Sequence, residues 1–381
     1  MNFIETYKRG KEDKSIRLST GIPALDITIK KLKKAMIIGV AAAPKVGKTV
    51  FADFAFVIQP YLDAERQGIL HKFHITYFSF EVDRVEKEYK FAAFFMYWDH
   101  KITTFTYKGV IYPIDDDYLM GNAIHRNANG SLEQIKVLPE HEELLKIVYK
   151  NRIVPLFGEW SVDGKRVLLE PDGTLKPRPI INLIEEQDNP TGIYKQLKRE
   201  AQVRGRFLIE NYETLDDHNR VVTKTREAGY IPNDPEAIWV VVIDHVRAVS
   251  DERGYNKKQL IDKTFEYERI LKKMCGITFV NVMHSNRGIA NVDRLKFHGE
   301  NIYPTSDDVK DSGNPSEDCT VFITLFNPHD EKYNLEKHMG IVLNDFPNYR
   351  SIHITENRRG PCPVHIQANF YHGINLITKL G

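Results

Sequence analysis

One strand–loop–helix pattern near the N-terminus constrains the fold of this chain more than any other part of its sequence. An apolar run at 36–41 precedes a short loop at 42–49, and an apolar helical pattern follows that loop. The loop ends in Gly47-Lys48-Thr49. In a phosphate-binding loop (P-loop), backbone N–H groups surround phosphate, a lysine reaches the β- and γ-phosphates and a hydroxyl binds magnesium. The sequence therefore predicts a nucleotide-binding P-loop.

The loop departs from the pattern GxxxxGK[ST] at one position, because Ala42 stands where the first glycine is usual. The alternative is an ordinary strand–turn–helix with an exposed Lys-Thr pair. We expect ATP as the nucleotide and Mg²⁺ as the metal, with the hydroxyl of Thr49 as one magnesium ligand. The residues expected to contact the nucleotide are Ala42, Ala43, Pro44, Lys45, Val46, Gly47, Lys48 and Thr49.

The composition is that of an ordinary globular protein. The chain has 381 residues, 42% of them hydrophobic, which allows one large or two modest domains. The net charge of +1 does not indicate nucleic-acid binding. Any contact with DNA or RNA must therefore come from local basic loops. The three cysteines are scattered, and no apolar run approaches the ~18 residues of a membrane span. Without a signal peptide, we expect a soluble cytoplasmic protein, of a cell or of an infected host, with no membrane contact.

A series of apolar runs predicts an α/β fold with a mainly parallel sheet. Such nearly continuous runs suit strands that helices bury on both faces. A helical pattern between two of the runs completes a βαβ unit. The last runs are close together and predict an antiparallel edge. The predicted strands are 36–41, 74–80, 238–243, 277–283, 320–325, 339–343, 350–355 and 363–370.

The predicted core is interrupted by a segment of different character. Residues 95–235 are rich in charged and aromatic side chains, and two Asp-Gly pairs between β-prone residues indicate hairpins. We therefore predict an insertion module there, with β-hairpins and helices. The predicted division is an N-terminal segment at 1–34, a first core part at 35–94, the insertion at 95–235 and a second core part at 236–381.

Four further residues supply what a nucleoside triphosphatase needs. Asp244 ends the most apolar run and is a candidate magnesium ligand, while Glu81 ends an earlier run and could orient the attacking water. His284 ends a third run and could sense the γ-phosphate; Arg358, on a turn, could reach a neighbouring subunit's nucleotide. For each there is a plainer alternative: a capping aspartate, a solvated glutamate, a polar strand end and a basic surface turn.

Together these motifs resemble the RecA-like core of the DnaB-type (superfamily 4) replicative helicases, including those of phages. The similarity covers roughly 15–95 and 236–375. The stretch 19–26 looks like the family's TGxxxLD motif, and 306–313 is similar to its SDLRGSG segment. The other matches are 42–49 with Walker A, 77–81 with FSLEM, 242–245 with Walker B, 283–287 with SQLNR, 317–321 with QDAD and 356–361 with KxRNGP.

The resemblance implies a RecA-like P-loop fold and assigns the candidate roles. Glu81 falls on the family's catalytic glutamate, His284 on its γ-phosphate sensor and Arg358 on its arginine finger. Glu356 replaces the lysine that accompanies that finger, which puts the two-cation form in doubt. The match begins close to the start of the chain, so we expect neither the N-terminal domain of bacterial DnaB nor a primase half.

The resemblance also implies a hexameric homo-oligomeric ring around single-stranded DNA, and a primase or other replication protein as a partner. Loops that follow the nucleotide-binding strands would then line the pore. The candidate DNA contacts are Arg253, Lys257, Arg287 and Lys310. Acidic neighbours of Lys310 argue against a simple basic funnel, and charged loops are often merely solvated.

Two other functions remain open. A RecA-like or KaiC-like ATPase could be stimulated by DNA and act as a recombination mediator or loader without unwinding a duplex. A degenerate P-loop protein with a structural role is a third possibility, because Ala42 and Glu356 depart from the family pattern. ATP turnover and strand displacement distinguish these from an ATP-dependent helicase.

Overall fold

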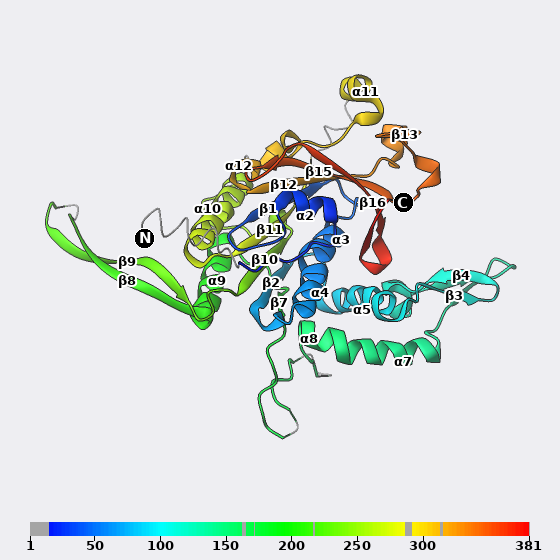
Figure 1. The fold of residues 1–381 in the computed structure, drawn as a ribbon, viewed down its shortest axis with the longest axis horizontal. Coiled ribbons are helices and arrows are strands. Elements are labelled where there is room, and N and C mark those ends of the chain that lie inside the picture. The colour runs from blue at the N-terminus through cyan, green and yellow to red at the C-terminus, as the bar shows by residue number, and fades with distance from the viewer. Residues whose placement is uncertain are drawn as a thin grey trace.

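A computed structural model describes residues 15–161, 165–170, 172–215, 218–285, 292–312 and 315–380. Within these ranges, a sheet of nine strands runs through the molecule in the order β17-β16-β15-β12-β1-β11-β10-β2-β7 (Figure 1). Its strands are β1 (Ile37–Ala42), β2 (Phe73–Ser79), β7 (Ile181–Ile184), β10 (Ile238–Asp244), β11 (Thr278–His284), β12 (Val321–Phe326), β15 (Tyr349–Asn357), β16 (Val364–Tyr371) and β17 (Leu376–Lys379).

The strands from β12 to β7 are parallel, and the remaining three form an antiparallel edge. This confirms the predicted α/β fold with a mainly parallel sheet. The predicted strand at 339–343 does not join this edge: the segment contains the short strand β14 (Ile341–Val342), which pairs with β13 (Lys337–His338) in a separate small ribbon. The short strands β7 and β17 were not predicted, because a four-residue edge strand leaves little periodicity.

Helices cover both faces of the sheet. Alternate residues of β1 divide between two apolar layers: Ile38 and Val40 belong to the layer beneath α3, α4 and α5, whereas Ile37 and Ala41 belong to the layer beneath α9 and α10. The helices are α2 (Pro23–Ile29), α3 (Lys48–Asp53), α4 (Gln59–Arg66), α5 (Arg84–His100), α6 (Asp116–Leu119), α7 (Pro139–Val148), α8 (Val154–Phe157), α9 (Pro190–Arg204), α10 (Lys257–Cys275), α11 (Val292–His298) and α12 (Pro315–Asp318).

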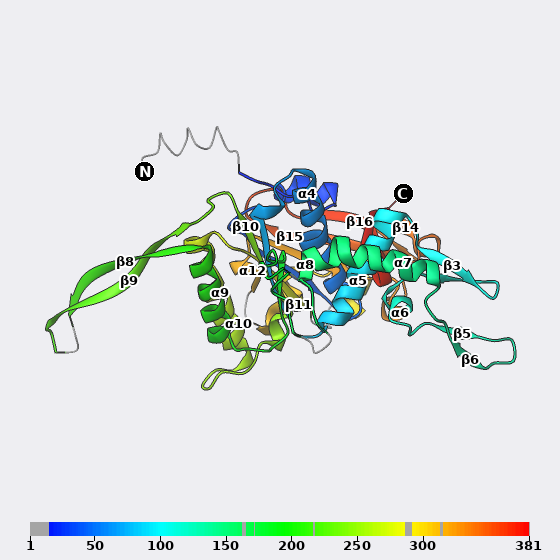
Figure 2. The ribbon, with the colours of Figure 1, turned by 90° about the horizontal axis from the view of Figure 1, so that it is seen from below.

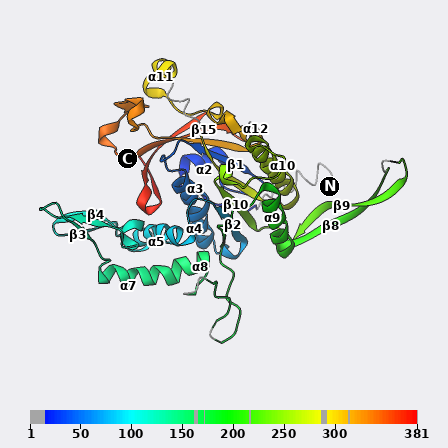
Figure 3. The same cartoon turned by 180° about the vertical axis from the view of Figure 1, so that it is seen from behind.

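Two groups of elements project from opposite ends of this core (Figures 2 and 3). A long twisted ribbon of β8 (Gly205–Leu215) and β9 (Val221–Pro232) extends from the end of α9. At the other end, α5 and α7 carry two small ribbons. These ribbons are β3 (Thr104–Tyr107) with β4 (Val110–Pro113), and β5 (Ile124–Arg126) with β6 (Leu132–Gln134).

The three ribbons all lie within 95–235, where hairpins were predicted, and the two Asp-Gly pairs lie between the paired residues of shorter hairpins that form no ribbon. There the structure shows single antiparallel bridges, between Trp160 and Arg166 and between Leu169 and Leu175; residues 162–164 and 171 are outside the described ranges. The segment is also not wholly separate from the core, because β7 pairs with β2. The domain division itself stays a prediction.

Candidate active site at the carboxyl edge of the sheet

The P-loop lies at the carboxyl edge of the sheet, by which we mean the edge where β1, β2, β10 and β11 end. Gly47 has a φ of 104°, and a Cβ there would lie 2.6 Å from Cε1 of His372. Glycine is therefore required for both its backbone conformation and its lack of a side chain. By contrast, Ala42 is the last residue of β1, and its carbonyl accepts from the N–H of Ser285 at 3.0 Å. A residue in an extended strand needs no glycine, which accounts for alanine at the first position of the motif.

Lys48 begins α3 and its side chain is buried beside the end of β11. Its Nζ donates to Nδ1 of His284 at 3.2 Å and lies 3.4 Å from the carbonyl oxygen of Ala43. Burial lowers the pKa of Lys48, and the negative charges of Asp244 and Glu81 oppose that shift. The ammonium group is therefore close enough to both the predicted magnesium ligand Asp244 and the predicted catalytic Glu81 for their charges to act on it.

His284 is held in its neutral form. Burial, followed by the charge of Lys48, lowers the pKa of His284 to about 4. Because Nδ1 accepts from the lysine, the proton of the neutral ring is on Nε2. The ring therefore offers one N–H as a donor for an oxygen bound near Lys48.

Asp244 ends β10 and is almost fully buried. Its Oδ2 accepts from the hydroxyl of Tyr77 at 3.2 Å, whereas its Oδ1 is buried without a hydrogen-bond partner among the described residues. A buried carboxylate oxygen without a donor is costly unless a cation completes it. Together with the hydroxyl of Thr49 at the start of α3, this donor set fits Mg²⁺, which prefers oxygen ligands and keeps several waters.

Glu81 follows β2 and is positioned by His245, a residue that the sequence analysis did not single out. Nε2 of His245 lies 2.7 Å from Oε1 of Glu81, and its Nδ1 accepts from the backbone N–H of Arg247 at 3.1 Å. With Nδ1 used as an acceptor, the neutral ring carries its proton on Nε2 and donates it to Glu81. The only sequence signal was its place directly after Asp244.

Glu81, His245 and His284 could also be considered for a transition metal, because their ligand atoms lie within 4.8 Å of one another. The hydrogen bonds argue against it. A histidine that binds a metal through Nε2 carries its proton on Nδ1, but Nδ1 accepts a hydrogen bond in both rings. The cluster is therefore better suited to donate hydrogen bonds to oxygen than to bind zinc.

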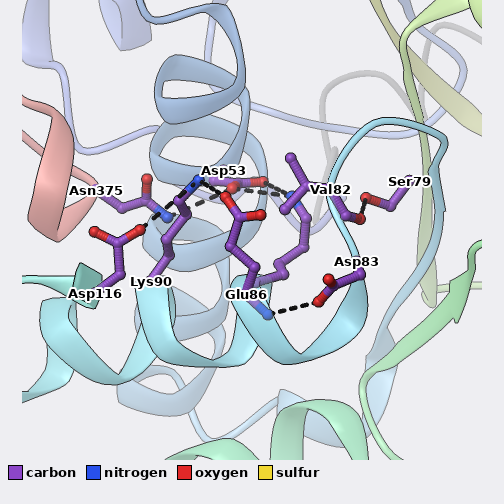
Figure 4. Close-up of polar contacts among 9 residues, drawn as sticks. Asp53, Ser79, Val82, Asp83, Glu86, Lys90, Asp116 and Asn375 are labelled. Atoms are coloured by element: carbon purple, nitrogen blue, oxygen red, sulfur yellow. Dashed lines mark hydrogen bonds and ion pairs between the residues drawn. The ribbon is translucent and has the colours of Figure 1, made fainter. Parts of the chain in front are cut away.

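A buried ion pair connects α3, the helix that follows the P-loop, to α5. Nζ of Lys87 on α5 lies 3.1 Å from each carboxylate oxygen of Asp53 on α3, and both side chains are inaccessible to solvent. Burial raises the pKa of Asp53, and Lys87 opposes the shift. Figure 4 shows Asp53 together with Asn375, which donates to it at 3.4 Å. Nζ of Lys87 also lies over the ring of Tyr77, whose hydroxyl donates to Asp244. The Asp53–Lys87 pair therefore connects the P-loop helix to the predicted magnesium ligand.

Arg358 lies at the opposite, amino edge of the sheet. β12 is parallel to β1, with Val321 beside Ile38, and the antiparallel β15 places Asn357 beside Val321. The turn after Asn357 is therefore about one strand length, roughly 20 Å, from the P-loop of the same chain. The structure does not bring Arg358 to the other predicted catalytic residues within one subunit.

The structure describes the side chains of two of the four predicted DNA contacts. Arg253 is exposed in the loop after β10, whereas Nζ of Lys257 donates to the carbonyl oxygen of Val249 at 2.6 Å and helps to close that loop. Arg287 lies outside the described residues. Lys310 lies in the 3₁₀ segment Ser306–Ser312, but its side chain is outside the described part.

The resemblance at 19–26 corresponds to a structural turn. The carboxylate of Asp26 accepts from the N–H and the hydroxyl of Thr20, both at 2.8 Å, and from the hydroxyl of Ser19. Asp26 thus ties the chain entering the core to α2. The motif contributes to packing rather than to the phosphate site.

Comparison with known proteins identifies the fold of the chain but not its activity. No protein-family model and no curated protein matches the chain. Among solved structures, a DnaB-like replicative helicase studied with its primase matches all of this chain and 68% of its own length, with a TM-score of 0.61 and 12% identity. A second solved structure, an ATPase domain, matches 99% of this chain and 97% of its own, with a TM-score of 0.61 and 12% identity.

These likenesses confirm the predicted RecA-like fold of DnaB-type helicases. A KaiC-like protein from Pyrococcus horikoshii also matches 96% of this chain and 100% of its own, with a TM-score of 0.45 and 11% identity. In the described part of the chain, no helix has the length and apolar character that would let it cross a membrane.

Proposed function

We propose that this protein is an ATP-driven motor that translocates on single-stranded DNA and unwinds duplex DNA as a ring of identical subunits. The observation that carries the proposal is the gathering of Lys48, Asp244, Glu81 and His284 at one edge of the sheet. Lys48 donates a hydrogen bond to His284, and the negative charges of Asp244 and Glu81 stabilise its charged form. Such an arrangement of one cation, two carboxylates and a neutral donor suits hydrolysis of a nucleoside triphosphate.

In this mechanism the P-loop backbone and Lys48 hold the β- and γ-phosphates. Thr49 and Asp244 would hold Mg²⁺, which neutralises charge on the phosphates when bound. Glu81 orients the attacking water, and the N–H of His245 keeps its carboxylate directed into the site. His284 donates a hydrogen bond from its Nε2–H to the γ-phosphate, and the ring loses this hydrogen bond when the phosphate leaves.

The position of Arg358 supports a ring. Because the turn at 357–361 lies at the amino edge, its arginine cannot complete the site of its own subunit but could complete that of a neighbour. The expected assembly is a hexamer in which each nucleotide lies between two subunits. Arg253, Lys257, Arg287 and Lys310 are proposed to contact DNA, and a primase or another replication protein is the proposed partner.

Two measurements test this function. ATP turnover should be measurable, should rise when single-stranded DNA is added and should be lost in Lys48→Ala. A forked duplex with a single-stranded tail should be separated in the presence of ATP. DNA-stimulated turnover without strand separation would instead support a recombination mediator or loader, and no turnover at all would leave a structural role.

A further inference from the structure

A second charged site lies at the amino edge of the sheet, away from the P-loop. A cavity of about 370 Å³ opens there between α9, the start of β7 and the segment before it. Arginines converge on it from two separate parts of the chain. Its polar lining includes Arg166, Arg178, Asn182, Arg199, Glu200 and Arg204.

The charges lining this cavity are not balanced. Glu200 is the one carboxylate among the lining residues, and neutral groups already occupy it: the hydroxyl of Thr76 donates to Oε2 at 2.7 Å, and the amide of Asn182 donates to Oε1 at 2.8 Å. Arg204 is 3.7 Å from it. Within the described ranges, Arg166, Arg178 and Arg199 have no carboxylate within ion-pair distance.

Burial and neighbouring positive charges lower the pKa of several basic groups around the cavity. Burial lowers the pKa of Arg166, and the charge of Arg178 lowers it further. For Arg204, burial again lowers the pKa, with Glu200 opposing and Arg178 adding to the shift. Burial and the charge of Arg204 lower the pKa of His74, at the start of β2, to about 4. Cations held together in a concave, partly dry site attract anions strongly.

A series of specific contacts holds the side chain of Arg204 at the cavity. The guanidinium of Arg204 stacks over the ring of Trp239, 4.9 Å from its centroid, and the indole N–H of Trp239 donates to the hydroxyl of Thr76 at 3.0 Å. That hydroxyl in turn donates to Glu200. The chain of contacts holds Arg204 in place, while its buried Nε lacks a hydrogen-bond partner in the described structure.

We propose that this cavity binds a phosphate-bearing anion. Arginine presents planar pairs of donors that match phosphate oxygens, and a cavity of this volume is within the range of small-ligand sites. Two of the arginines come from the last turns of α9 and two from the segment before β7, so a bound phosphate would join the two. The site is distinct from the P-loop because the two lie at opposite edges of the sheet. The proposal does not depend on the proposed motor function.

The phosphate could belong to a free polyphosphate or to the backbone of single-stranded DNA, and two probes distinguish these. Both experiments use the full chain with Lys48→Ala, so that the P-loop no longer competes for phosphate. The test variant adds Arg178→Ala and Arg199→Ala, which are exposed side chains at the rim. The matched control adds Lys195→Ala, an exposed lysine one turn away on α9 that does not line the cavity.

The first probe is inorganic tripolyphosphate, with binding measured by calorimetry. Loss of two charge-assisted contacts should weaken its binding by about tenfold or more, whereas the Lys195 control should stay within about twofold. The second probe is a labelled oligothymidylate, with binding measured by fluorescence anisotropy at several salt concentrations. If the site binds DNA, its affinity should fall and the slope of log affinity against log salt should become shallower by about 1.4.

Loss of binding to either probe in the test variant alone supports the site and identifies the source of phosphate. The proposal is overturned if the arginine variant binds both probes as tightly as the control, or if the control loses as much as the test variant. The melting temperature of both proteins without probe checks folding. Should the double variant melt lower, Arg178→Gln and Arg199→Gln, tested singly, preserve side-chain length and carry the same comparison.

Discussion

The two edges of the central sheet differ in the charges that they hold, and that difference separates chemistry from binding. At the carboxyl edge, Lys48 lies among Glu81, Asp244 and a neutral histidine. At the amino edge, arginines surround one carboxylate whose oxygens are already occupied. Hydrolysis requires a carboxylate for the metal and another for water, so the groups at the first edge suit catalysis, whereas those at the second suit the proposed binding of an anion.

The edges also differ in how they are braced. Beneath the P-loop, an inaccessible Asp53–Lys87 pair connects α3 to α5 and, through Tyr77, to Asp244. The arginine cavity depends on one stacked side chain and a short hydrogen-bond chain, while two of its arginines remain exposed. A buried ion pair suits the fixed geometry of a transition state, and exposed arginines, which have several rotamers, suit ligands of varied shape.

The largest effect is expected from breaking the carboxyl edge at Lys48. Lys48→Ala removes the cation that is proposed to contact the β- and γ-phosphates, and ATP turnover should fall by ~10³-fold or more, to background. A coupled assay of ADP release measures this. Lys195→Ala, which removes an exposed lysine on α9, should hydrolyse ATP normally. Turnover retained in Lys48→Ala would place the chemistry elsewhere.

The next effect concerns Arg358, which lies at the amino edge and is proposed to act at a neighbour's carboxyl edge. Arg358→Ala should reduce turnover by ~10³-fold while leaving nucleotide affinity intact, because an arginine finger stabilises charge in the transition state. Mixing Arg358→Ala subunits with Lys48→Ala subunits should restore part of the activity at mixed interfaces. Normal turnover in the Arg358 variant would contradict the action between subunits.

Removing one member of the buried pair should destabilise the braced edge. Lys87→Met leaves Asp53 buried without its counter-charge, and the free energy of unfolding should fall by about 3–5 kcal/mol. The double variant Lys87→Met/Asp53→Leu replaces both charges and should recover much of this loss. Urea unfolding measures both. Equal stability of Lys87→Met and the unmodified protein would show that the pair does not brace the site.

A smaller effect is expected from His245, which contacts Glu81. His245→Ala should lower kcat by about 10–100-fold with little change in KM, because it disorients the carboxylate without touching the nucleotide. His245→Gln, which keeps an N–H donor at a similar distance, should recover part of the rate. If alanine and glutamine variants have the same kcat, the N–H···carboxylate contact is not what matters.

The smallest effect is a pH dependence at the amino edge. The pKa of His74 is about 4 in the folded protein, against an ordinary value of 6.5. The unfolded chain therefore binds the proton more tightly, so the contribution of neutral His74 to stability is complete above pH 6.5 and declines as the pH falls toward 4. His74→Gln should flatten the decrease in unfolding free energy between pH 7 and 5. An unchanged slope would mean that His74 is not desolvated among the arginines.

The chemistry at the carboxyl edge could be predicted from sequence because it falls on strand ends. Asp244, Glu81 and His284 each end a nearly continuous apolar run, and parallel strands bring their ends to one edge. His245 was missed because the hydrogen bond to Glu81 joins loops that are distant in sequence. The ribbon of β8 and β9 was missed because its strands alternate weakly and the Asp-Gly pairs elsewhere indicated turns more strongly.

Local patterns in the sequence predicted the parallel sheet, the P-loop and the order of the candidate catalytic residues, since apolar periodicity and loop motifs are local properties of the chain. The three-dimensional arrangement was needed to show that Arg358 lies a strand length away from its own P-loop and that arginines from α9 and from the segment before β7 line one cavity. The physical reason is that strand order and register, which no local pattern encodes, determine which strand ends and helix ends become neighbours.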